Sequence, residues 1–215
     1  MKLISYPVIV VNRIIHLVKE PKRIRKLEKT IEVIRREHNK AHDRGMVHYR
    51  NVYNVGLYVL ILEHDITVLK HDALFSIWEW RKKYVARQLS VLLYEASHDL
   101  PALLGKNFRG SLKTLPISED DLSEFNSITK SLDKFKRNNH VLLNKLRNYA
   151  GAHRDNDAEK QLEVIDSISL LQIMELSGNF YEVLRVLLPF LIKLTYMLGN
   201  WKVIMKHMPF EGNNT

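Results

Sequence analysis

The sequence has no cysteine, and it has only eight glycines and six prolines in 215 residues. The absence of cysteine excludes disulfides and thiolate metal sites, and it is compatible with a reducing cytoplasm. So few glycines and prolines supply little turn chemistry for a fold with many strands, which favours helices. The sequence also lacks a glycine-rich phosphate loop and a serine in a recognisable nucleophile elbow.

Long uninterrupted apolar runs are missing at both ends of the chain. The apolar run 7–11 is interrupted by Asn12 and Arg13, and no small-residue cleavage site follows it. An apolar stretch near the C-terminus contains Arg185 and Lys193 about two helical turns apart, which is too much charge for a bilayer span. We therefore expect no signal peptide, no contact with a membrane and a cytoplasmic location.

Apolar residues recur at spacings of three and four along most of the chain, which is the period of an amphipathic helix. With 46% hydrophobic residues the chain can also bury a substantial core. The pattern predicts an all-α, up-and-down bundle of five to six helices. The predicted helices span residues 22–44, 51–70, 72–100, 118–150, 158–176 and 179–207, with a long loop at 105–116.

Local signals mark three of the predicted helix ends. Gly45 interrupts the first helical pattern, and Gly151 stands where the helix from residue 118 should end. Ser118 followed by Asp121 resembles a capping box, with the acid in place of the usual Glu or Gln. We expect residues 1–50 to form a basic helical extension and residues 51–210 to form the bundle domain.

Positive charge is concentrated near the N-terminus. The net charge is +9, and the segment from Arg13 to Arg50 contributes +7, from twelve Lys or Arg and five acids. Such a segment is suited to lying along phosphates, although a solvated basic helix would look the same in sequence. The candidate RNA-binding residues of this segment are Lys22, Arg23, Arg25, Lys26, Arg35 and Arg36.

Four aromatic residues, Phe75, Trp78, Trp80 and Tyr84, are close together in the sequence. Their rings could stack on nucleic-acid bases. Aromatic residues at helical spacing are more often part of a core, and we interpret these four as packing residues.

The stretch Leu146–Asp157, LRNYAGAHRDND, combines residues suited to phosphodiester chemistry. On an unbroken helix the side chains of Arg147 and His153 would point about 120° apart, so they converge only if the helix ends between them. Gly151 stands where that would happen. A histidine can transfer a proton to or from a ribose oxygen, and an arginine can hold the phosphate. Asn148 adds a neutral hydrogen bond.

The segment RNYAGAH, residues 147–153, resembles the Arg-x(4–6)-His motif of HEPN domains (higher eukaryotes and prokaryotes nucleotide-binding), in which Asn often follows the Arg. The likeness covers roughly residues 72–207. It implies catalytic roles for Arg147 and His153 and a supporting role for Asn148. Arg154 lies outside the motif, and we add it as a second cation for RNA.

HEPN domains are four- or five-helix bundles that commonly dimerise, and many are metal-independent endoribonucleases of toxin–antitoxin, abortive-infection or CRISPR systems. The resemblance therefore implies RNA as substrate, a homodimer, an antitoxin or effector protein as a further partner, and no cofactor. Other HEPN domains have lost activity and serve as binding modules, so a catalytically silent module is the alternative. A third interpretation is a plain helix end, whose cations interact with the helix dipole.

The ten histidines raise two metal hypotheses. The pair His64 and Asp65 resembles the signature of HD-domain phosphohydrolases, but the upstream candidate ligand, His48, is only sixteen residues away, which leaves too little chain for the intervening elements. His38 and His42 stand one helical turn apart, yet no glutamate completes an HExxH motif. We predict no metal site and keep the HD interpretation as a lesser alternative.

Overall fold

The computed structural model describes residues 6–115, 117–148 and 158–199, and of residues 6–19 it describes the backbone. Within these ranges the chain contains seven helices and no strand, which confirms the predicted all-α bundle with one helix more than the predicted maximum. The helices are α1 (Tyr6–Asp43), α2 (Val47–Phe75), α3 (Glu79–Leu103), α4 (Lys106–Lys113), α5 (Glu119–Leu146), α6 (Ala158–Ser167) and α7 (Leu170–Gly199).

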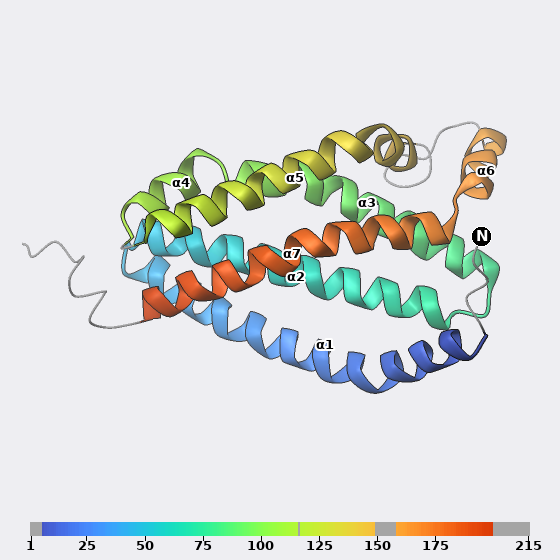
Figure 1. Cartoon of the computed structure of the whole chain (residues 1–215), viewed down its shortest axis with the longest axis horizontal. Helices are drawn as coiled ribbons and strands as arrows, with labels where there is room; N and C mark the ends of the chain where they lie inside the picture. The colour runs from blue at the N-terminus through green and yellow to red at the C-terminus, as the bar shows by residue number, and fades with distance from the viewer. Residues whose placement is uncertain (1–5, 116, 149–157, 200–215) are drawn as a thin grey trace, which may run out of the picture.

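The five long helices run up and down along the long axis of the molecule, and the short helices α4 and α6 lie at its two ends (Figure 1). Helix α2 packs against α1, α3, α4 and α7, while α5 packs against α3 and α7. Helix α2 is therefore the centre of the bundle, and α1 covers its outer side. The division between a basic extension, residues 1–50, and a bundle domain remains a prediction, and its boundary falls in the first turn of α2.

Aromatic rings connect three helices in the core. The ring of Phe125 on α5 lies between those of Phe108 on α4 and Phe190 on α7, with centroids 5.5 and 5.8 Å away. A second pair, Phe135 and Phe180, joins α5 to α7 at 4.9 Å. Separations and tilts of this kind are favourable for aromatic side chains. These contacts hold α5, the helix that leads to the candidate motif, in a fixed position.

Helix α2 is long and apolar enough, by length and composition, to cross a membrane. Core helices of soluble proteins meet the same criterion, and 56% of its most apolar stretch is buried inside the bundle. It is the single helix of the described ranges that meets this criterion, whereas the apolar stretch singled out in the sequence belongs to α7. The apolar character of α2 is explained by its central place, where neighbouring helices cover several of its sides.

The break predicted at Gly45 is confirmed. Gly45 has φ +66°, a left-handed conformation that glycine adopts without a steric penalty. The Met46 N–H donates to the carbonyl of Ala41 at 2.8 Å, and the Gly45 N–H donates to that of His42 at 3.0 Å. This pair of hydrogen bonds is a Schellman motif, and it ends α1 and turns the chain into α2.

The predicted capping box at the start of α5 is also confirmed. The backbone N–H of Ser118 donates to the Asp121 carboxylate at 2.9 Å, and the backbone N–H of Asp121 donates to the Ser118 hydroxyl at 3.2 Å. Asp121 is buried and also binds the ammonium of Lys193 on α7. The hydrogen bond from Lys193, followed by those from Ser118, lowers the pKa of Asp121 although burial opposes this. The start of α5 is thus tied to α7.

The predicted loop at 105–116 is wrong, because most of it forms α4. Phe108 and Leu112, one helical turn apart, are both buried, so the segment has an apolar face that packs in the core. Gly105 permits the tight connection that precedes it, since a Cβ atom there would come within 2.8 Å of a carbonyl oxygen of α3. The glycines that suggested a loop therefore belong to a close turn and to the exposed side of a short helix.

Three predicted helix boundaries are also wrong. Helix α1 begins at Tyr6, whereas we predicted its start at residue 22. Helix α2 continues to Phe75 and α3 begins at Glu79, whereas we predicted one helix from residue 72. Helix α7 begins at Leu170 and runs through Gly178, where we predicted a break. The reason is the unbroken buried stripe of this helix, which outweighs the cost of one glycine. Its buried apolar residues are Ile173, Leu176, Phe180, Leu184, Leu187, Phe190, Leu191, Leu194 and Leu198.

The packing role predicted for the aromatic group at the α2–α3 connection is wrong for three of its four members. Phe75 is half-buried, but the side chains of Trp78, Trp80 and Tyr84 are 65%, 61% and 53% exposed. They lie before and within the first turns of α3, and the inward face of this helix is taken by buried residues that begin with Val85. Helical spacing alone did not show which side of the helix would face the core.

Candidate active site

Arg147 and Asn148 directly follow α5, whose last residue is Leu146. At these two residues the helix widens into a π-type turn, a distortion that is frequent at functional sites. Gly151, His153 and Arg154 lie outside the described residues, which resume at 158. The approach of His153 to Arg147 and the helix end at Gly151 therefore remain predictions.

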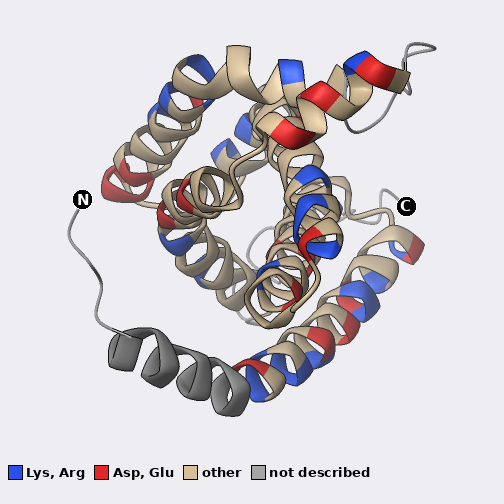
Figure 2. Ribbon diagram, turned by 90° about the vertical axis from the view of Figure 1, so that its right-hand side faces the viewer, with Lys and Arg blue, Asp and Glu red and all other residues tan. Residues whose placement is uncertain are grey.

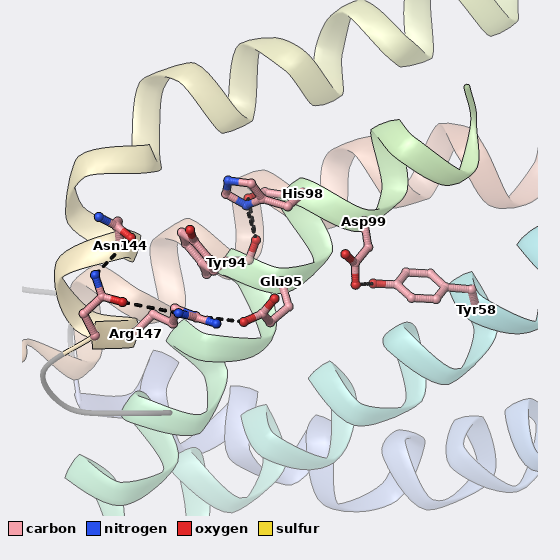
Figure 3. A network of polar contacts seen from close by, with 9 residues as sticks. Tyr58, Tyr94, Glu95, His98, Asp99, Asn144 and Arg147 are labelled. Carbon is pink, nitrogen blue, oxygen red and sulfur yellow. Dashed lines mark hydrogen bonds and ion pairs between the residues drawn. The ribbon is translucent and has the colours of Figure 1, made fainter. Parts of the chain in front are cut away.

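Arg147 is anchored on the neighbouring helix α3 (Figure 3). Its Nε–H donates to a carboxylate oxygen of Glu95 at 2.9 Å, and its guanidinium lies over the ring of Tyr94, 5.3 Å from the centroid. A longer hydrogen bond of 3.4 Å runs to the side-chain oxygen of Asn148, whose amide donates to Asn144 at 3.3 Å. The guanidinium is thus fixed by partners from two helices.

The position of Arg147 leaves it able to bind an anion. Its side chain is 28% exposed, and contacts to described residues use two of its five N–H donors. A planar guanidinium with free N–H groups can hold a phosphate through two parallel hydrogen bonds. The ring of Tyr94 on one face and Glu95 at one edge restrict the directions from which a phosphate can approach.

Glu95 is a site residue that the sequence analysis did not identify. It lies 52 positions before Arg147, and no local pattern connects the two residues. Its carboxylate balances the charge of Arg147 and orients the guanidinium, although the pair is partly exposed and so contributes little to stability. The sequence does contain an acidic residue on the helix that packs against α5. It can be recognised as a partner of Arg147 only when the packing of the helices is known.

The site also contains three rings that the sequence analysis left unassigned. The rings of Tyr94 and His98 on α3 are 4.3 Å apart, and the ring of His140 on α5 lies 5.6 Å from His98 and 6.2 Å from Tyr94. The Nδ1 atom of His98 lies 2.8 Å from the carbonyl oxygen of Tyr94, which orients the imidazole (Figure 3). Arg147 therefore stands at one end of a cluster of aromatic and imidazole rings.

The candidate RNA-binding residues on α1 fall into two groups. Lys22, Arg25, Lys26, Arg35 and Arg36 have exposed side chains. In Figure 2 this helix lies along the outside of the bundle, with basic and acidic residues alternating along it. The side chains of these five residues are accessible to a polyanion such as RNA. A solvated basic helix without an RNA-binding role would show the same exposure.

Arg23 differs from the other basic residues of α1. It donates to the buried carboxylate of Glu63 on α2 at 2.6 Å and to the hydroxyl of Tyr181 on α7. Its guanidinium also lies 4.9 Å from the centre of the Tyr181 ring. We therefore assign Arg23 to the packing of α1 against the bundle and not to a phosphate-binding surface.

The geometry argues against the two metal hypotheses. His48 and His64 both lie on α2, and sixteen residues of helix separate them by about 24 Å, too far to bind one ion. His64 instead lies 3.3 Å from Asp65 and 3.8 Å from Glu28. No group of three or more His, Cys, Asp or Glu suited to a metal ion occurs among the described residues, including the region of His38 and His42.

Comparisons of the chain with protein-family models, with curated proteins and with solved structures give no match.

Proposed function

We propose that this protein is an HEPN-like, metal-independent endoribonuclease, with Arg147 and His153 as catalytic residues and Asn148 in support. The observation that carries the proposal is the position of Arg147 after the last turn of α5, anchored by Glu95 and still partly exposed. The up-and-down arrangement of the helices fits the resemblance. A partly exposed arginine and a histidine that approaches it would provide what phosphodiester cleavage needs without a metal.

The proposed reaction is an internal transesterification. The ribose 2′-oxygen attacks the adjacent phosphorus, the bond from phosphorus to the 5′-oxygen breaks, and the products are a 2′,3′-cyclic phosphate and a 5′-hydroxyl. His153 removes the 2′-hydroxyl proton and then donates a proton to the leaving 5′-oxygen, so that no proton is gained or lost overall. Arg147 stabilises the charge that develops on the phosphoryl oxygens, and Asn148 adds a neutral hydrogen bond.

The proposed substrate is RNA, gathered in part by the exposed cations of α1 and by Arg154. A single-stranded or duplex RNA that contacts several such cations releases counterions, so binding should weaken steeply with salt. A cytoplasmic location belongs to the same proposal. So does a role in a toxin–antitoxin or phage-defence system, with an antitoxin or effector protein as partner, and this role rests on the resemblance.

We also propose that two copies of the chain pair along the groove between α2 and α3. The groove has a volume of about 440 Å³ and leads from Tyr84 to Glu95, so a copy seated there would lie next to Arg147. Ile61 and Val68, two turns apart on the same side of α2, are 47% and 39% exposed, and exposed apolar side chains beside a groove can take part in an interface. Pairing there would bring two motifs close together.

The second candidate function is a catalytically silent binding module. The ion pair of Arg147 with Glu95 favours it, because a guanidinium that is already neutralised by a carboxylate binds phosphate less readily. In this case the cations of α1 and the groove would still hold partners, but no RNA would be cleaved.

An RNA cleavage assay in the presence of EDTA tests the proposal. The wild type is compared with His153→Ala and Arg147→Ala, each checked for folding by circular dichroism, and with His38→Ala as a control histidine outside the site. Cleavage by the wild type and by His38→Ala alone, leaving 2′,3′-cyclic phosphate ends, supports the endoribonuclease. If no protein cleaves a broad panel of RNAs, the binding module replaces it.

A further inference from the structure

The rings beside Arg147 form a short, bent row across the seam between α3 and α5, in which all three ring centroids lie within 6.2 Å of one another. Tyr94 and His98 are four residues apart and share one face of α3, where their rings are 4.3 Å apart. His140 extends the row from α5, at 5.6 Å from His98. The guanidinium of Arg147, 5.3 Å from the Tyr94 ring, completes it.

The row follows from helical spacing. His140 and Arg147 are seven residues apart, so they lie on one face of α5 and about 10 Å apart along its axis. Lys136, one turn before His140, lies on the same face. Because α3 and α5 pack against each other, this face of α5 meets the face of α3 that carries Tyr94 and His98.

The three rings reach from the edge of the core, against which Tyr94 packs, to the surface of the bundle. Tyr94 and His98 are half-buried and His140 is exposed, while Leu93 and Leu143, on the inward sides of the two helices, are fully buried. The ring of His140 therefore has a face open to solvent. Packing against the core accounts for Tyr94, but it does not account for His140, which is exposed.

The basic residues near the row favour a ligand that carries both negative charge and aromatic rings. Arg147, paired with Glu95, lies at one end, and Lys136 and Arg137 precede His140 at the other. Asp99, the acid nearest to His98 in sequence, is turned toward α2, where it accepts a hydrogen bond of 3.1 Å from Tyr58 (Figure 3). Burial, together with the Asp99 charge, raises the pKa of Tyr58, so the hydroxyl stays protonated and keeps the hydrogen bond.

We infer that the row of Tyr94, His98 and His140 is a nucleobase-binding subsite for single-stranded RNA, placed beside the phosphate that Arg147 holds. This inference rests on the proposed function and names its substrate class. Stacking on aromatic rings tolerates any base, but it needs a base whose face is free. Bases inside a duplex are stacked on their neighbours, so the subsite selects single strands, loops and ends.

The experiment measures binding separately from cleavage. A short fluorescent RNA with 2′-O-methyl groups cannot undergo the attack by the 2′-oxygen, so its dissociation constant reports binding alone. It is offered as a single strand and as the same strand annealed to its complement. The variants are His140→Ala, which removes an exposed ring, and His140→Phe, which keeps one. Val141→Ala is the matched control, because Val141 is the next residue of α5 and is 82% exposed.

We expect the wild type to bind the single strand more tightly than the duplex. His140→Ala should weaken binding of the single strand by about tenfold, the usual scale for one lost stacking contact, while His140→Phe restores it and Val141→Ala has no effect. No binding of the single strand, equal binding by His140→Ala and the wild type, or a duplex bound as tightly as the single strand would each overturn the inference.

Failure of this inference can be told apart from failure of the proposed function. If cleavable RNA is cut in EDTA but His140→Ala leaves both binding and KM unchanged, the subsite is wrong and the nuclease stands. If the single strand binds through His140 but no RNA is cut, the subsite stands and the nuclease is wrong.

Discussion

Replacing Glu95 by Gln tests how the carboxylate that anchors Arg147 affects the affinity of the protein for RNA. The change is nearly isosteric, and the new amide oxygen can still accept the hydrogen bond from Nε of Arg147, so the guanidinium should stay in place while the carboxylate charge is lost. A phosphate held by Arg147 would lie about 6 Å from that charge. In a solvent-like dielectric this repulsion is about 0.7 kcal/mol, or roughly threefold in affinity.

The expected result for Glu95→Gln is a KM for RNA that falls about threefold, with kcat nearly unchanged. The free energy of unfolding should fall by less than about 1 kcal/mol, because the ion pair is partly exposed to solvent. Steady-state cleavage kinetics and thermal unfolding measure the two effects. Asp99→Asn is the matched control, because it removes a charge one turn further along α3, from a carboxylate that is hydrogen-bonded to Tyr58.

A different outcome would refute this reasoning. If Glu95→Gln lowered kcat a hundredfold at constant KM, Glu95 would take part in proton transfer and not merely orient Arg147. If Asp99→Asn lowered KM as much as Glu95→Gln did, the effect would come from general charge and not from the position of Glu95.

Three predictions concern stability. Ser118→Ala should lower the free energy of unfolding by about 1 kcal/mol in urea titrations, because it removes half of the capping box; no change would show that the box is dispensable. Asp121, whose pKa is lowered by its α7 lysine, should stabilise the fold above its ordinary pKa of 3.8 and lose this effect as pH falls through its folded value. Asp121→Asn should therefore flatten the loss of stability below about pH 4, and an unaltered pH profile would contradict this. Arg23→Met leaves the buried Glu63 without its cation, so it should lower the free energy of unfolding by about 1–3 kcal/mol. Lys22→Ala, at an exposed neighbour, should lower it by less than about 0.5 kcal/mol. Equal effects of the two changes would refute the packing role of Arg23.

The features predicted correctly from the sequence are those set by a few adjacent residues. The turn at Gly45 and the capping box of Ser118 and Asp121 depend on local hydrogen bonds, and both are present. The all-α class follows from helical periodicity, which the long helices show over many turns. Local chemistry therefore predicted the class of the fold and several helix ends.

The features that were not predicted from the sequence depend on packing between distant segments of the chain. Glycine in the region of α4 suggested a loop, but the burial of Phe108 and Leu112 favours a helix there. The exposure of Trp80 could not be predicted, because periodicity does not show which face of α3 meets its neighbours. The contact of Glu95 with Arg147 joins residues 52 positions apart, and it exists only because α3 and α5 lie side by side. The motif could be located in the sequence, but its anchor could not.

The number of long helices has a consequence for how the chain can be rearranged. Five long helices that alternate in direction leave the start of α1 and the end of α7 at opposite ends of the molecule (Figure 1). Helix α7 has 30 residues and so is about 45 Å long. A circular permutant that joined Tyr6 to Gly199 would need at least about 13 fully extended linker residues to span that length. Fluorophores fused near these two positions would likewise be far apart, so energy transfer between copies would distinguish parallel from antiparallel pairing.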